Sequence, residues 1–163
     1  NIDLHADFND ILSAHQVIMN YEAADVHRED FRARPDDYAP NVRRIVEAGM
    51  VTSEAAYAEA RRTLRMFRSY MKDSIGSFDV LLTPSTASEA PKDLSTTGDP
   101  AFQTPWTACG FPAIAIPSGL SQSGLPLGIQ IVSGPFYEER LLSVAQWCER
   151  VMGIYFAPGH NKL

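Results

Sequence analysis

The sequence contains little cysteine. Its 163 residues include only Cys109 and Cys148, which lie far apart along the chain. This spacing predicts neither a disulfide framework nor a CxxC redox motif. We therefore expect two reduced, partly buried thiols and a cytoplasmic protein.

Positive charge is also scarce. The chain has 14 Lys and Arg against 20 Asp and Glu, which gives a formal net charge of −6. Affinity for phosphate groups comes mainly from clustered Lys and Arg, so this composition argues against nucleic acid as a partner. Anionic membrane surfaces are disfavoured for the same reason. We expect no nucleic-acid partner and no membrane partner.

Long apolar runs are missing as well. No stretch approaches the roughly 20 apolar residues that a membrane-spanning helix needs. The first residues, Asn-Ile-Asp-Leu-His, resemble no signal peptide and include no initiator Met. We therefore expect that the chain begins inside a longer protein, although a processed N-terminus would give the same sequence.

Motifs for metals, cofactors and nucleophilic catalysis are largely absent. The four histidines form no HExxH pattern and pair with no nearby cysteine, and the chain has no phosphate loop or dinucleotide fingerprint. Ser69 and Lys72 match the S-x-x-K spacing, but the serine lies deep in a predicted helix and the partner motifs S-D-N and K-T-G are missing. We predict no metal site, no cofactor and no catalytic residue in this chain.

The first half of the sequence is predicted to be helical. Apolar residues recur at helical spacing over residues 8–30, 41–48 and 53–74, with Gly49 expected to end the second helix and Thr52 or Ser53 expected to cap the third. The third helix also carries a basic face, and acidic residues of the first helix are its expected partners. The face consists of Arg61, Arg65, Arg68 and Lys72, and the acidic residues are Glu22, Asp25, Glu29 and Asp30.

The second half changes character and predicts strands. Short apolar runs at residues 78–82, 113–116 and 127–132 are bounded by Pro, Gly and Ser, as expected for strands covered on both faces. A Ser/Thr/Pro-rich loop spans residues 84–105, and loops of this length are often functional. A last helix is predicted over residues 138–152. The fold class is therefore α/β.

Candidate binding residues follow from this reading. Ligands of open α/β sheets gather at the carboxyl ends of strands, which places Thr83, Pro84 and Ser85 after the first strand and Pro117-Ser118 after the second near a cleft. Trp106 and Thr107 are candidates for its wall, although Trp106 is equally well explained as a core residue. Gln130 interrupts an apolar strand, and we expect its amide to bond an internal backbone group.

The order and spacing of several motifs resemble the C-terminal section of the amidase signature family. The motifs are Asp79–Pro84, Pro105–Thr107, Gly110–Ala113, Ile116–Gly119 and Gly124–Gln130, with Met19–Ala23 and Ala60–Arg62 upstream. The resemblance covers nearly the whole chain. It implies that residues 1–163 are one segment, the C-terminal part of an α/β/α domain with a mixed central sheet.

That family hydrolyses carboxamides through a serine nucleophile, a second serine in a cis peptide and a lysine. Its Gly/Ser-rich signature is absent from this sequence, and none of Lys72, Lys92 and Lys162 lies in the matching context. The resemblance therefore implies a substrate-side portion that acts on a small amide together with a missing N-terminal segment. The isolated chain is expected to be inactive.

A second interpretation remains open. The chain could be a shortened, non-catalytic binding or assembly module that completes its sheet by pairing between chains. The predicted strands lack the polar alternation that would let one face meet water. Under either interpretation we expect the isolated chain to form a homo-oligomer.

Overall fold

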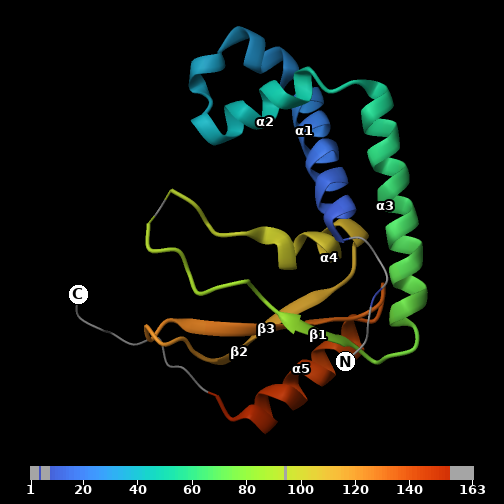
Figure 1. The fold of residues 1–163 in the computed structure, drawn as a ribbon, viewed down its shortest axis with the longest axis vertical. Helices are drawn as coiled ribbons and strands as arrows, with labels where there is room; N and C mark the ends of the chain where they lie inside the picture. Colours follow the sequence, from blue (N-terminus) through green and yellow to red (C-terminus); the bar gives the residue numbers. More distant parts are fainter. Residues whose placement is uncertain (1–3, 5–7, 94, 155–163) are drawn as a thin grey trace. The chain divides into compact units, whose positions relative to one another are not determined.

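The computed structural model describes residue 4, residues 8–93 and residues 95–154 of the chain. Two compact units divide the sequence, residues 1–70 and residues 71–163. The first unit is helical, whereas the second contains the β-sheet (Figure 1). Helix α3 (Glu54–Ile75) begins in the first unit and ends in the second.

The first unit contains α1 (Phe8–Ala33), the short 3₁₀ helix η1 (Pro35–Asp37), α2 (Pro40–Met50) and the larger part of α3. The three predicted helices are confirmed, with ends that differ by a few residues. Ser53 begins α3 as expected, because its hydroxyl accepts a hydrogen bond from the amide of Ala56 at 3.2 Å.

Gly49 lies inside α2, and the prediction that it ends the helix is wrong. A Cβ added at this position would lie 1.8 Å from the carbonyl oxygen of Asn20 on α1. Glycine is needed here because the backbones of the two helices approach each other closely, and not because the chain turns. Next to it, Ala24, Phe31 and Val46 form one apolar cluster.

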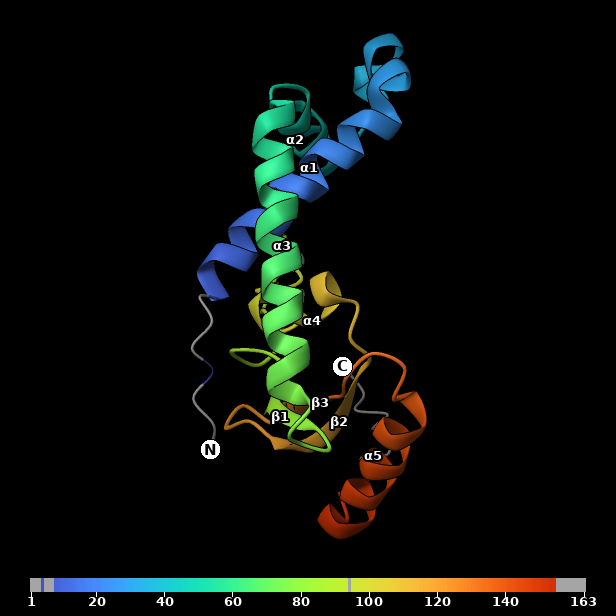
Figure 2. The ribbon, with the colours of Figure 1, turned by 90° about the vertical axis from the view of Figure 1, so that its right-hand side faces the viewer.

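Helices α1 and α3 are joined by apolar and polar contacts within the first unit, and Figure 2 shows α1 crossing α3 obliquely. Ala14, Ile18 and Ala60 form their apolar cluster. Beside it, the Tyr57 hydroxyl donates to Glu22 at 2.8 Å, and Arg61 lies 3.8 Å from the same carboxylate. The expected acidic partner of the basic face is therefore confirmed for Arg61.

The second unit contains a three-stranded sheet with the order β1-β3-β2. Its elements are β1 (Leu81–Pro84), η2 (Pro100–Phe102), α4 (Thr104–Cys109), β2 (Ala113–Leu120), β3 (Pro126–Val132) and α5 (Glu138–Met152). Both pairings are antiparallel, so β1 and β2 run in the same direction on either side of β3. The predicted α/β class is confirmed.

The first strand lies later in the sequence than predicted. Phe78, the predicted first residue, belongs to the turn after α3, because its amide donates to the carbonyl of Ile75 at 2.9 Å. Thr83 and Pro84 are the last two residues of β1, so the prediction that they follow the strand is wrong. Proline is tolerated at this position because β1 is an edge strand among the described residues.

The second strand is longer than predicted. It continues from the expected residues 113–116 to Leu120, with a register shift between Pro117 and Gly119. Pro117 and Ser118 therefore lie within β2 and do not follow it. A bulge explains how the strand passes Pro117 without losing its pairing with β3.

Helical segments cover both faces of the sheet (Figure 1). Ile131 of β3 packs with Leu141 and Ala145 of α5 on one face. The preceding residue, Gln130, points to the opposite face and donates to the carbonyl of Phe102 in η2 at 2.9 Å. The second unit is therefore a three-layer arrangement of helix, sheet and helix.

Coverage of the sheet is unequal. Ile131 and Val132 of the central strand are fully buried, as predicted for a strand covered on both faces. Leu82 of β1 and Leu120 of β2 are 62% and 53% exposed. The expectation of cover on both faces therefore holds for the last three residues of β3, which are buried, and fails at these positions of the edge strands.

Candidate functional site

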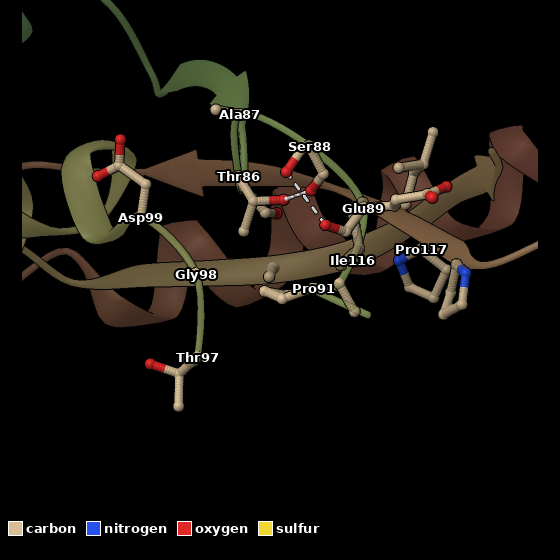
Figure 3. A pocket seen from close by; sticks show the side chains of 16 residues that line it. Thr86, Ala87, Ser88, Glu89, Pro91, Thr97, Gly98, Asp99, Ile116 and Pro117 are labelled. Carbon is tan, nitrogen blue, oxygen red and sulfur yellow. Dashed lines mark hydrogen bonds between the residues drawn. The ribbon is translucent and has the colours of Figure 1, made fainter. Parts of the chain in front are cut away.

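A cavity of about 530 Å³ lies where β1 ends. Four stretches line it: residues 85–91, residues 97–99, residues 115–117 of β2 and residues 126–128 of β3. Figure 3 shows Ile116 and Pro117 of β2 beside the loop residues of the first two stretches. The β1–α4 connection, which the sequence singled out as a long loop, therefore forms most of its wall.

Two glutamine side chains, Gln103 and Gln130, hold the ends of this loop; we call them the amide clamp. Gln103 Nε2 donates to the carbonyl oxygen of Ser85 at 2.5 Å. Gln130 Nε2 donates to the carbonyl of Phe102 at 2.9 Å and to the hydroxyl of Thr83 at 3.2 Å. The prediction of an internal backbone partner for Gln130 is confirmed. The clamp fixes the loop at its start and at its end.

Ser85 and Gly128 meet at the wall of the cavity. The amide of Ser85 donates to the carbonyl of Gly128 at 3.0 Å, which extends the pairing of β1 with β3 by one residue. A Cβ at Gly128 would lie 2.9 Å from Ser85 Oγ. The missing side chain of Gly128 therefore leaves the room that the serine side chain occupies.

Glu89 joins the loop to the β2–β3 hairpin. Its carboxylate accepts a hydrogen bond from the hydroxyl of Ser123, which is itself 2.9 Å from the hydroxyl of Ser121. Hydrogen bonds from Ser121 and Ser123 lower the pKa of Glu89 below its ordinary value of 4.5, because they stabilise the charged form. Glu89 is therefore a carboxylate at neutral pH.

Asp99 provides the second carboxylate along the cavity. Its Oδ1 accepts a hydrogen bond from the amide of Ala101 at 2.9 Å and so caps η2. Among the described residues that line the cavity there is no Lys, Arg or His. The charged groups along its wall are therefore all negative in this part of the chain.

The predicted binding residues fall in different places. Ser85 lines the cavity, and Thr83 and Pro84 directly precede it in β1. Trp106 is 4% exposed in α4, and the neighbouring Thr107 is exposed. Neither residue of α4 lines this cavity. Their contact with substrate stays a prediction.

Sequence reasoning missed α4 and three residues near the cavity: Glu89, Gln103 and Gly128. Pro105 early in α4 and Gly110 in the left-handed conformation after it are typical helix boundaries, and this signal was available. Glu89 and Gln103 carried no such signal, because both act through partners 18 to 34 residues away.

The described part of the chain contains neither a cluster of metal-binding side chains nor a helix that could span a membrane. No group of three or more His, Cys, Asp or Glu side chains there could hold a metal ion. Its helices are also too short or too polar to cross a membrane.

Comparison with the profiles of known protein families shows to which family this chain belongs. The profile of the Amidase family matches residues 4–142, which is most of the chain. The chain belongs to the amidase family. The resemblance inferred from the second-half motifs is thereby confirmed.

Two curated members of the amidase family illustrate the relationship. Human fatty-acid amide hydrolase 2 is 34% identical over 118 residues, which is 71% of this chain and 22% of that protein. A glutamyl-tRNA(Gln) amidotransferase subunit from Granulibacter bethesdensis is 30% identical over 139 residues, covering 78% of this chain and 28% of that protein. The chain therefore spans about a quarter of the length of these relatives.

A solved amidase structure has the same fold. It superimposes with a TM-score of 0.80 at 25% sequence identity, covering 88% of this chain and 36% of the amidase. The likeness extends over most of the present chain and confirms the predicted amidase-type α/β architecture.

Proposed function

We propose that this chain is the C-terminal, substrate-side portion of an amidase-type hydrolase that cleaves carboxamide C–N bonds. The observation that carries the proposal is the 530 Å³ cavity at the end of β1 in a chain that belongs to the amidase family. The share of the relatives that the chain spans, 22% to 36%, supports a role as one portion of a longer enzyme.

In this proposal the nucleophile and the proton-transferring groups come from a preceding N-terminal segment. Ser69 and Lys72 lie in the C-terminal part of α3 and do not supply them. Binding groups without a nucleophile, a base and oxyanion donors provide little stabilisation of the transition state. The chain alone is therefore inactive, and the segment that precedes it in the complete enzyme is its principal partner.

Thr83, Pro84, Ser85, Trp106 and Thr107 are the proposed substrate-binding residues. Ser85 lines the cavity directly. Thr83 and Pro84 hold it in place as the end of β1, and the Thr83 hydroxyl is engaged by Gln130. Trp106 and Thr107 begin a second wall on α4, which the N-terminal segment completes. The substrate is a small amide and the enzyme is cytoplasmic.

One observation favours a second candidate function, a non-catalytic binding or assembly module. Both β1 and β2 are edge strands among the described residues, and such edges pair readily with strands of another chain. In that case the chain would complete its sheet in a homo-oligomer or with a different protein, and the cavity would bind an amide without hydrolysing it.

The encoding reading frame and one activity assay separate these functions. We expect an upstream Gly/Ser-rich segment with tandem serines, and we expect the full product to hydrolyse 4-nitroacetanilide while residues 1–163 alone do not. Inactivity of a full product that carries this segment, tested against a panel of amides, would contradict the hydrolase. Turnover by residues 1–163 that disappears in Ser69→Ala or Lys72→Ala would contradict the missing nucleophile.

A further inference from the structure

The cavity at the end of β1 has mainly aliphatic walls. The side chains of Ala87, Ala90, Pro91, Ile116 and Leu127 line it, and no aromatic ring does so among the described residues. Apolar walls of this kind favour binding by removing hydrocarbon from water, and they offer no ring on which a flat aromatic group could stack. The shape and chemistry therefore fit a short aliphatic chain.

Two carboxylates flank this aliphatic surface. Figure 3 shows Asp99 and Glu89 towards opposite sides of the cavity, with Gly98 and Pro91 between them. Glu89 is held in its charged form by the hydroxyls of the β2–β3 hairpin, and Asp99 is fixed as the cap of η2. Both carboxylates are anchored in place, so they do not depend on a ligand for their position.

We propose that the cavity selects amides whose aliphatic chain carries an ammonium group, and that it rejects amides that carry a carboxylate. The inference rests on the proposed function and adds to it the charge of the substrate. The lining residues carry two carboxylates and no cation, while Lys92, which follows the lining residue Pro91, interacts with Glu89 and offsets one of the two negative charges. An anionic ligand would therefore still meet a net negative charge, and like charges at short range destabilise one another.

Three amides of similar length test the charge preference on the chain itself. Butanamide is neutral, 4-aminobutanamide is a cation and succinamate is an anion at pH 7. Binding is followed by NMR through the methyl signals of Ile116 and Leu127, which line the cavity. We expect 4-aminobutanamide to bind about tenfold more tightly than succinamate at low ionic strength, with butanamide between them. Added salt should reduce the differences in affinity between the three amides, because it screens the charges.

A pair of matched variants separates the cavity from the overall charge of the protein. Glu89→Gln removes one negative charge at the cavity, and Glu138→Gln removes one from the exposed start of α5. Glu89→Gln should reduce the preference for the cation several-fold, whereas Glu138→Gln should leave it unchanged. Circular dichroism verifies that both variants fold.

These experiments test the charge preference and the cavity as a ligand site separately from the hydrolase proposal. Equal binding of the three amides, tighter binding of succinamate, or equal effects of the two variants would overturn the charge preference and leave the hydrolase proposal standing. Failure of all three amides to shift the Ile116 and Leu127 signals would overturn the cavity as a ligand site. The activity of the full reading-frame product decides the hydrolase proposal independently of these measurements.

Discussion

Gln103 donates its side-chain amide to the carbonyl oxygen of Ser85 across a distance of 2.5 Å and 18 residues of sequence. This single bond joins the two ends of the loop that forms most of the cavity wall. Gln130, on the central strand, holds the same two ends through Thr83 and Phe102. The wall of the cavity is therefore attached to the most deeply buried strand of the sheet.

Replacing Gln130 by leucine should destabilise the second unit by about 1–3 kcal/mol, because the carbonyl of Phe102 would lose its partner at a buried site. Urea unfolding followed by the fluorescence of Trp106 and Trp147, both of which lie in this unit, measures the change. Gln122→Leu, at an exposed position on the hairpin, should cost no more than about 0.5 kcal/mol. Equal losses of stability in the two variants would contradict the role of Gln130 in the amide clamp.

Gly128→Ala should destabilise the second unit by about 1–2 kcal/mol, because the new Cβ would lie 2.9 Å from Ser85 Oγ. Removing that oxygen should relieve the conflict. We therefore expect the double variant Gly128→Ala with Ser85→Ala to be more stable than Gly128→Ala alone, as measured by a double-mutant cycle in urea. Additive effects of the two substitutions would show that they do not interact.

Gly49→Ala tests the close approach of α1 and α2. Alanine favours helix over glycine by about 1 kcal/mol, so propensity alone predicts stabilisation. The Cβ would collide with the backbone of Asn20, and we expect a net loss of roughly 3 kcal/mol, seen as a lower melting temperature by circular dichroism. Glu47→Ala, at an exposed position of the same helix, is the control and should change stability little. A stabilised Gly49→Ala would contradict the helix packing.

The pKa of Glu89 should lie below its ordinary value of 4.5, because the serine hydroxyls of the hairpin stabilise its charged form. A lowered carboxyl pKa contributes stability that is complete above 4.5 and is lost as the pH falls through the lowered value. We expect the contact between loop and hairpin to weaken only in that acidic range. An NMR titration of the Glu89 carboxyl measures the pKa.

Variants of the serines identify the cause of that shift. Ser121→Ala and Ser123→Ala should each raise the pKa of Glu89 towards 4.5. Ser88→Ala is the matched control, because the Ser88 hydroxyl donates to the Glu89 backbone carbonyl and not to its carboxylate. A larger shift in the control than in the hairpin variants would contradict the assignment.

The exposed edge of β1 should cause self-association. Leu82 is 62% exposed and lies opposite Ile131, on the face where Ile131 packs against α5. We expect Leu82→Ser to weaken oligomers measured by sedimentation, because it removes exposed apolar surface from a strand that lies at the edge of the described sheet. Val51→Ser, at an exposed position of the first unit, should have no effect. A monomer at all concentrations would contradict the association.

Sequence pattern was sufficient for the long helices and for the central strand, because each has a strong local periodicity. The hydrogen bond of Gln130 to an internal backbone group could also be predicted, because a buried polar side chain in an apolar strand needs a partner. The edge strands were harder. Phe78 is apolar but belongs to a turn, and β2 passes Pro117 by means of a bulge, so apolar runs did not mark their ends.

The candidate site was predictable only in outline. The end of β1 could be inferred from the general position of ligands in α/β sheets, and Ser85 does line the cavity. Glu89 could not be found in this way, because its role depends on serines of a hairpin that lies 34 residues away. Gly128 and Gly49 likewise acquire their meaning from Ser85 and Asn20, which only the folded chain places beside them.

The attachment of the cavity loop at both ends also governs how its length can change. Because Gln103 and Gln130 hold Ser85 and Phe102, residues inserted between these points need not disturb the sheet. Doubling the length of a flexible loop adds only about 0.6 kcal/mol of closure entropy. Insertions and deletions around residues 95–98 are therefore an inexpensive route by which this scaffold can acquire cavities of new size, with the strands beneath left unaltered.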